Sequence, residues 1–227
     1  MYQPRYEDKL MPGSSHQVII GKIKDSTEVR KILDIGIGTG ILGRWFSGKG
    51  YEISGIEPNP NWARQAKKYY TDIFVGTLEE TPTNFFQKAD VVVFGDVLEH
   101  MSDPFTALKR VVSIQKNGTI FIISVPNIAN IWIRLNLLFG KFEYTTRGIL
   151  DDTHLKFFTK KSLKSMLEES GLAIIEIIPT PIPLDLVNSF FRNSKVGRRI
   201  YLMLLWVTIR FPTLLGYQFV CFAERLS

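Results

Sequence analysis

Short hydrophobic runs alternate with amphipathic segments along most of this chain. The run at 89–95 is apolar over VVVFG, which is typical of a strand covered by helices on both faces, so we expect it at the centre of a sheet. The alternation predicts an α/β fold on a largely parallel sheet with right-handed crossovers. Runs of strand length occupy residues 29–35, 51–57, 72–76, 89–95, 119–126, 173–179 and 217–225.

The helix starts between these runs carry recognisable caps. Asn59 and Asp103 each precede a proline, and their side chains can accept hydrogen bonds at a helix start while proline tolerates the first helical position. Thr159 holds the cap position before KKSLKSMLEES, and Gly171 ends that helix. Helices are expected at about 41–50, 60–70, 104–114 and 160–170.

At 227 residues the chain fits a single domain over residues 1–227. Its cofactor-binding half is expected at about 29–100. Two segments, 128–152 and 179–215, fall outside the regular alternation, and insertions of this length near strand ends often carry lids or binding loops. We therefore place substrate recognition in these helical insertions.

Composition and charge narrow the class of protein. A hydrophobic fraction of 45% with 22% charged residues is that of a globular protein rather than a disordered chain or a multi-span membrane protein. Cys221 is the single cysteine, and MYQPRYEDKL lacks the basic-then-apolar pattern of a secretory signal, so the expected compartment is cytoplasmic. The net charge of +6 suits an anionic partner or substrate.

The strongest chemical signal is the glycine run in LDIGIGTG, which follows a strand and opens a helix. Gly36, Gly38 and Gly40 permit a tight turn and let a cofactor approach the backbone, while the helix start supplies unpaired N–H groups. A dinucleotide site would have a glycine three residues after Gly38, where this chain has Ile41. The spacing favours an adenosyl cofactor without a pyrophosphate over NAD. The alternative is a turn that only packs helix on strand.

Other polar residues follow strands at the carboxyl edge of the sheet, where ligands bind in open α/β folds. Glu57 ends its strand about 20 residues after the glycines, where a carboxylate can bind both ribose hydroxyls. The alternative for Glu57 is an acid that stabilises the next helix start. Thr77 and Leu78 are placed to meet an adenine ring, and Asp96 follows the next strand.

Together, DIGIGTG, IEPNP, DVVVFGDVLEHMSDP, SVPN and DDTHLKFFT with the SLKSMLEESGL helix resemble the class I S-adenosylmethionine-dependent methyltransferases. The resemblance is to the small bacterial group related to the ubiquinone-biosynthesis O-methyltransferases, and it covers about residues 15–178 and the last strand. It implies a doubly wound, Rossmann-like seven-stranded sheet with an antiparallel last strand, and S-adenosylmethionine as cofactor.

The resemblance also implies roles for individual residues. Many relatives have an acid where this chain has Thr77, so adenine recognition is expected to rest on backbone groups. The implied cofactor-binding residues are Asp34, Gly36 and Gly38 at the methionine moiety, Glu57 at the ribose, Thr77 and Leu78 at the adenine, and Asp96 beside the methionine amino group.

Two histidines are candidate catalytic residues. His154, at the end of the first insertion, is the expected general base. His100 lies in the LEH segment next to the cofactor, where it either packs or takes part in catalysis. Asp151 and Asp152 accompany His154, but no second cluster at ligand spacing does, so no metal site is expected.

The segment 192–211 places basic residues before an apolar helix candidate. Its apolar part, 200–209, is too short to span a bilayer. One interpretation is peripheral membrane contact through an interfacial helix near anionic lipid or a lipid-linked substrate. The other is a helix packed on the sheet or on the second subunit of a homodimer. The amphipathic stretch 128–140 has the same alternatives.

Methyl transfer from a sulfonium needs alignment more than covalent catalysis, which agrees with the lack of a catalytic triad. We expect a methyltransferase acting on a hydroxyl or amine of a small-molecule substrate, such as a sugar or lipid-linked intermediate. Nucleic acid is not an expected partner, because GDVLEH stands where a base-flipping enzyme would carry its pocket motif. The competing hypothesis is an S-adenosylmethionine-binding regulatory or scaffold protein without transfer activity. A nicotinamide-dependent oxidoreductase is disfavoured by Ile41.

Overall fold

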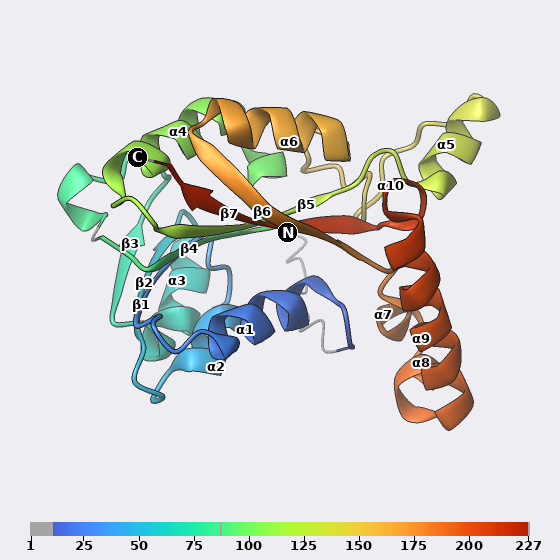
Figure 1. Cartoon of the computed structure of the whole chain (residues 1–227), viewed down its shortest axis with the longest axis horizontal. Coiled ribbons are helices and arrows are strands. Elements are labelled where there is room, and N and C mark those ends of the chain that lie inside the picture. The colour runs from blue at the N-terminus through green and yellow to red at the C-terminus, as the bar shows by residue number, and fades with distance from the viewer. Residues whose placement is uncertain (1–10, 87, 227) are drawn as a thin grey trace.

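A computed structural model describes residues 11–86 and 88–226, whose strands form one seven-stranded sheet with helices on both faces (Figure 1). Residues 1–10, on which the argument about a secretory signal rests, lie outside the described residues.

The strand order is β3-β2-β1-β4-β5-β7-β6, so β4 lies at the centre as its apolar sequence predicts. Neighbouring strands from β3 to β5 pair in parallel, and β7 runs antiparallel to both β5 and β6. The predicted fold class and the antiparallel last strand are thereby confirmed. The strands are β1 (Lys31–Ile35), β2 (Glu52–Glu57), β3 (Asp72–Val75), β4 (Val91–Gly95), β5 (Ile120–Pro126), β6 (Leu172–Thr180) and β7 (Gln218–Arg225).

Helices cover the two faces of the sheet in separate layers (Figure 1). One face packs on α1 (Ser15–Asp25), α2 (Ile41–Phe46) and α3 (Pro60–Ala66), the other on α4 (Pro104–Ile114) and α6 (Lys160–Glu169). Successive strand residues supply the two cores because side chains alternate across a strand. Ile32 and Val93 belong to the core under α1 and α2, and Leu33 and Phe94 to the core under α4 and α6.

The predicted caps form, and they fix where the helices begin. The side chain of Asn59 accepts from the backbone N–H groups of Asn61 and Trp62, and Asp103 accepts from Thr106. Thr159 completes a capping box with the backbone and side chain of Ser162. Two helices end earlier than predicted: α2 stops at Phe46, and α3 passes into a 3-10 turn, η1 (Lys67–Tyr69).

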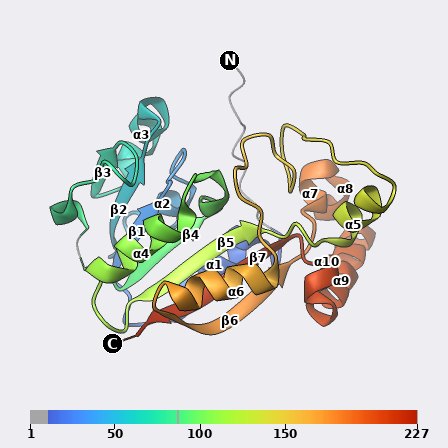
Figure 2. The same cartoon turned by 90° about the horizontal axis from the view of Figure 1, so that it is seen from above.

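The helices of the two predicted insertions form a group beyond one end of the sheet (Figure 2). None of the helices within 11–86 and 88–226 combines the length and hydropathy needed to cross a membrane. The first insertion contains α5 (Ile131–Leu138), and the second contains α7 (Leu184–Val187), α8 (Phe190–Asn193), α9 (Lys195–Arg210) and α10 (Pro212–Leu215).

Candidate functional site

The glycine run forms the turn from β1 into α2. Gly36, Gly38 and Gly40 all have left-handed φ angles, of 72°, 52° and 85°, which side chains rarely tolerate. Space also excludes a side chain at two of them. A Cβ on Gly36 would lie 2.5 Å from a methyl group of Val97, and one on Gly40 would lie 2.9 Å from the Cβ of Ala66. The turn therefore packs against α3 and against the segment after β4. The glycines that make this packing possible are the same ones that are predicted to bind the cofactor.

Glu57, the predicted ribose-binding acid, lies directly beside this turn. It ends β2 with only 3% of its surface exposed. One carboxylate oxygen accepts from the backbone N–H of Gly38 at 2.8 Å, and the other accepts from that of Asn59 at 2.9 Å. Burial raises the pKa of Glu57, and these two hydrogen bonds oppose the rise. The carboxylate is held in place with lone pairs left for further donors.

Asp34, predicted at the methionine moiety, has a partner that the sequence argument missed. The hydroxyl of Tyr70 donates to Asp34 at 2.5 Å and accepts from the backbone N–H of Gly43 at 3.2 Å. Burial raises the pKa of Asp34 to about 7, and the nearby Glu57 adds to the rise while the Tyr70 hydrogen bond opposes it. Tyr70 belongs to no motif, so sequence alone gave no reason to single it out.

The loop after β3 carries Thr77 and Leu78, the predicted adenine neighbours. The Thr77 backbone N–H donates to the carboxylate of Glu80 at 2.8 Å, so the exposed acid of this loop binds the loop itself. Leu78 is buried in the core under α4. The guanidinium of Arg110, on α4, donates to the carbonyls of Leu78, Glu79 and Thr81. These hydrogen bonds hold the loop against α4.

Asp96, after β4, is the described non-glycine residue with a left-handed backbone, at a φ of 57°. Strain of this kind persists where surrounding contacts enforce it, and it often marks a functional site. Here Ser124 of β5 enforces it: its hydroxyl donates to the Asp96 carboxylate at 2.5 Å and accepts from the Asp96 backbone N–H at 2.9 Å. A lone serine in the apolar run FIISVP was the available sequence signal for this support.

The two candidate catalytic histidines, His100 and His154, lie next to each other although they are far apart in the sequence. Thr153, which neighbours His154 and is 53 residues from His100, is within hydrogen-bond distance of the His100 ring. The rings of His100 and His154 lie 4.8 Å apart between centroids, at 69°. His100 belongs to the 3-10 turn η3 (Leu98–His100), and the backbone N–H groups of Leu155 and Lys156 donate to the carbonyl of Glu99 in that turn. The end of the first insertion thus returns to the carboxyl edge of the sheet.

Hydrogen bonds assign the tautomers of both rings. Nδ1 of His154 lies 3.1 Å from the carbonyl of Ile149, so that nitrogen carries the proton. Nδ1 of His100 lies 3.2 Å from the Thr153 carbonyl and from its hydroxyl, whose own hydrogen is donated to Asp151. In the neutral rings, both Nε2 atoms therefore carry a lone pair. Burial lowers the pKa of His154 below its ordinary value of 6.5, which favours the neutral form.

Glu99 joins the two histidines in a cluster of metal-ligand type. One donor atom from each of Glu99, His100 and His154 lies within 4.8 Å of the others. Carboxylate oxygen and imidazole nitrogen are common ligands of divalent cations, and second-shell carbonyl bonds to Nδ1 are usual for ligating histidines. The sequence argument considered Asp151 and Asp152 as companions of His154, whereas the fold places Glu99 and His100 there.

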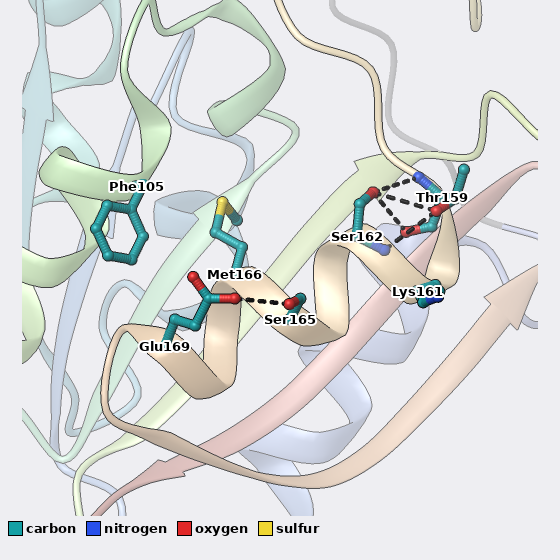
Figure 3. A pocket seen from close by; sticks show the side chains of 7 residues that line it. All are labelled: Phe105, Thr159, Lys161, Ser162, Ser165, Met166 and Glu169. Atoms are coloured by element: carbon teal, nitrogen blue, oxygen red, sulfur yellow. Dashed lines mark hydrogen bonds between the residues drawn. The ribbon is translucent and has the colours of Figure 1, made fainter.

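A surface hollow between α4 and α6 contains none of the predicted site residues (Figure 3). Four of its polar residues already bind one another: Thr159 and Ser162 form the capping box of α6, and the Ser165 hydroxyl donates to Glu169 at 2.7 Å. We therefore place the functional site at the carboxyl edge of β1, β2 and β4 rather than in this hollow.

Comparison with known proteins gives a family for this arrangement. Residues 17–177 match the model of a family described as methyltransferase domain. A ubiquinone biosynthesis O-methyltransferase from Bradyrhizobium sp. (strain ORS 278) is 29% identical over 154 residues, which are 64% of this chain and 59% of that protein. This chain thus spans about three fifths of the length of that relative.

Solved structures share the fold at low identity. A SAM-dependent methyltransferase from Archaeoglobus fulgidus superposes with a TM-score of 0.59 and 18% identity, over 95% of this chain and 96% of that one. A magnesium protoporphyrin IX methyltransferase from Synechocystis PCC 6803, with bound SAH, has a TM-score of 0.62 and 14% identity, over 93% of this chain and 84% of that one.

Proposed function

This chain belongs to the methyltransferase domain family, and from that membership we propose that it transfers a methyl group from S-adenosylmethionine to a hydroxyl group of a small molecule. The observation that carries the proposal is the direct hydrogen bond between the glycine turn and Glu57, the two parts of the predicted adenosyl-binding site. The cofactor, when bound, would supply both the methyl group and the leaving group.

The residues present fit such a cofactor. Glu57 is fixed by two backbone N–H groups and keeps lone pairs for the ribose hydroxyls. Asp96, held by Ser124, would accept from the methionine amino group, and Asp34, held by Tyr70, would line the methionine moiety. Thr77 and Leu78 remain the predicted neighbours of the adenine.

The hydroxyl acceptor is supported by the histidine pair and by the name of the relative. The Bradyrhizobium relative is an O-methyltransferase of ubiquinone biosynthesis. A hydroxyl nucleophile profits from a base as its oxygen attacks the methyl carbon. Because the hydrogen bond to the Ile149 carbonyl keeps the proton of His154 on Nδ1, Nε2 carries the free lone pair. Nε2 is therefore the atom that would accept the hydroxyl proton.

Incubating the protein with methyl-labelled cofactor and candidate hydroxyl compounds tests this function, with label in the product as the readout. His154→Ala should lower turnover by about 10² to 10⁴, the usual contribution of a general base, while cofactor affinity stays nearly unchanged. His16→Ala, which alters a histidine of α1 outside the site, is the matched control. Near-normal turnover in His154→Ala would refute the base.

Two further outcomes separate the alternatives. Cofactor binding without methyl transfer to any compound would favour the regulatory or scaffold protein. The cluster of Glu99, His100 and His154 supports a second way to activate a hydroxyl, because a bound divalent cation lowers the pKa of its oxygen ligand. Turnover that chelation abolishes and added metal restores would make His154 a ligand instead of the base.

A further inference from the structure

Helix α9 exposes a stripe of large apolar side chains. Its buried residues are Gly197, Tyr201 and Thr208, which lie on the side packed against the rest of the protein. On the opposite side, Leu202, Met203, Trp206 and Ile209 are each at least half exposed, with Trp206 at 68%. Steps of three and four residues place these four side chains on one face of the helix. A contiguous stripe of large apolar side chains that is exposed on a protein surface usually marks an interaction site.

Positive charge surrounds this stripe, and negative charge is absent from the segment. Residues 186–217 contain five basic residues and no Asp or Glu, and residues 128–142 contain two basic residues and no acid. These two segments together carry seven positive charges and no negative charge. Since the whole chain has a net charge of +6, the remainder of the chain is close to neutral. The bases of the first segment are Arg192, Lys195, Arg198 and Arg199 before the stripe and Arg210 after it.

The two segments lie at the same end of the molecule. Side-chain amides just before α5 donate to backbone carbonyls around α10: Asn127 to Thr213 and Gly216, and Asn130 to Gly216 at 3.0 Å. Figures 1 and 2 both place α5, α9 and α10 beyond the same end of the sheet. Helix α5 and the residue after it add exposed side chains of the same kind: Trp132, Leu138 and Phe139.

We propose that this end of the molecule, with α9 lying in the plane of the surface, docks on an anionic lipid bilayer. At 16 residues, α9 is about 24 Å long and meets a membrane along its side. An apolar stripe between basic residues, with tryptophan among the apolar ones, is the pattern of an interfacial helix. Pairing with a second copy would bring two acid-free, cationic segments together, whereas an anionic surface complements them. The stripe itself offers nothing to the polar backbone of a nucleic acid.

Vesicle flotation tests the proposal directly. At low salt, the full chain should float with phosphatidylcholine vesicles containing a quarter phosphatidylglycerol, and remain largely unbound with pure phosphatidylcholine. Binding should fall as salt screens the charges. Absence of flotation with the anionic vesicles at low salt would overturn the proposal.

A charge-reversal pair tests the location. Each basic residue near an anionic surface typically contributes about fivefold in affinity, so Arg198→Glu/Arg199→Glu should weaken vesicle binding on the order of 25-fold or more. Lys67→Glu/Lys68→Glu alters net charge equally in η1, which follows α3 at the β3 edge, whereas α9 packs against β6 at the other edge. Equal loss in both variants would mean that binding follows net charge alone and would overturn the assignment to α9.

Tryptophan quenching tests the depth of the stripe. Because Trp132 is exposed at the same end, the test uses Trp132→Phe as its background. Brominated lipid should quench fluorescence in Trp132→Phe and in Trp45→Phe/Trp132→Phe, and the quenching should fall sharply in Trp132→Phe/Trp206→Phe. Equal quenching in Trp132→Phe and Trp132→Phe/Trp206→Phe would remove α9 from the lipid contact. Gel filtration with light scattering tests whether a second copy of the chain covers this face instead. A stable dimer that Leu202→Ser/Trp206→Ser converts to monomer, together with no vesicle binding, would assign the face to a second copy.

Discussion

In the half of the sheet formed by β1, β2 and β4, large apolar side chains are buried between two layers of helices, whereas at the end that carries α5 and α9 they face solvent. Phe94 of β4 is completely buried, and Trp206 of α9 is 68% exposed. Both belong to similarly apolar stretches of the chain, VVVFG and YLMLLWV. The difference lies in what covers them: β4 has a strand on each side and helices on each face, but α9 has the protein on one side only.

The polar groups of the two regions differ in the same way. Asp34 and Glu57 are buried, each is bound by donors from other segments, and burial raises the pKa of both. Acids of the first insertion that lie outside the two acid-free segments, such as Glu143 and Asp152, are exposed. Apolar burial and fixed polar groups thus characterise the region that would hold a cofactor, and exposed apolar and basic groups characterise the region that would meet a partner. Matched substitutions in the two regions test this contrast.

The largest effect is expected from aromatic truncation. Phe94→Ala removes a fully buried ring from the core under α4, so it should lower the free energy of unfolding by about 3 to 5 kcal/mol. Trp206→Ala removes a ring that is mostly in water, and the change should stay below about 1 kcal/mol. Urea denaturation of both variants measures the difference. Comparable losses would mean that α9 is covered in solution by something that the single chain does not contain.

The next effect concerns pH and the buried carboxyl group of Asp34. Its pKa is raised from 3.8 to about 7 in the folded state, so the folded protein holds a proton that the unfolded chain has lost between these values. Stability of the cofactor-free protein should therefore fall as pH rises, and level off above about 7. From pH 5 to pH 8 the Asp34 contribution amounts to about 3 kcal/mol.

Asp34→Asn removes that titration, so the variant should gain stability relative to the wild type as pH rises over this range. Asp152→Asn, which changes an exposed acid of the insertion, is the matched control. Parallel profiles for wild type and Asp34→Asn, measured by urea denaturation, would contradict a buried Asp34 that resists ionisation.

The smallest effect is on cofactor affinity. Glu57→Ala removes charge-assisted hydrogen bonds to the ribose and should weaken binding of S-adenosylhomocysteine about tenfold or more, equivalent to about 1.4 kcal/mol. Glu143→Ala, in the first insertion, should bind as the wild type does. Calorimetry on the two variants decides, and unchanged affinity in Glu57→Ala would remove Glu57 from the site.

Sequence alone determined the sheet, the helix caps and the glycine turn, because these features follow from local rules. The seven hydrophobic runs became the seven strands to within about two residues, and Asn59, Asp103 and Thr159 all cap as predicted. Glu57 and the glycine turn were expected at one site for the same reason, since consecutive parallel strands end at the same edge of the sheet. Their direct hydrogen bond was not predicted.

Only the tertiary structure decided which distant side chains meet. Tyr70 reaches Asp34 across 36 residues, Ser124 holds Asp96 across 28, and the insertion brings His154 beside His100. Such contacts depend on how loops return to the sheet, and no local spacing records that. Exposure of the α9 stripe was undecided for the same reason: a periodic pattern identifies an apolar face of a helix, but the packing of the remaining chain determines whether that face is covered.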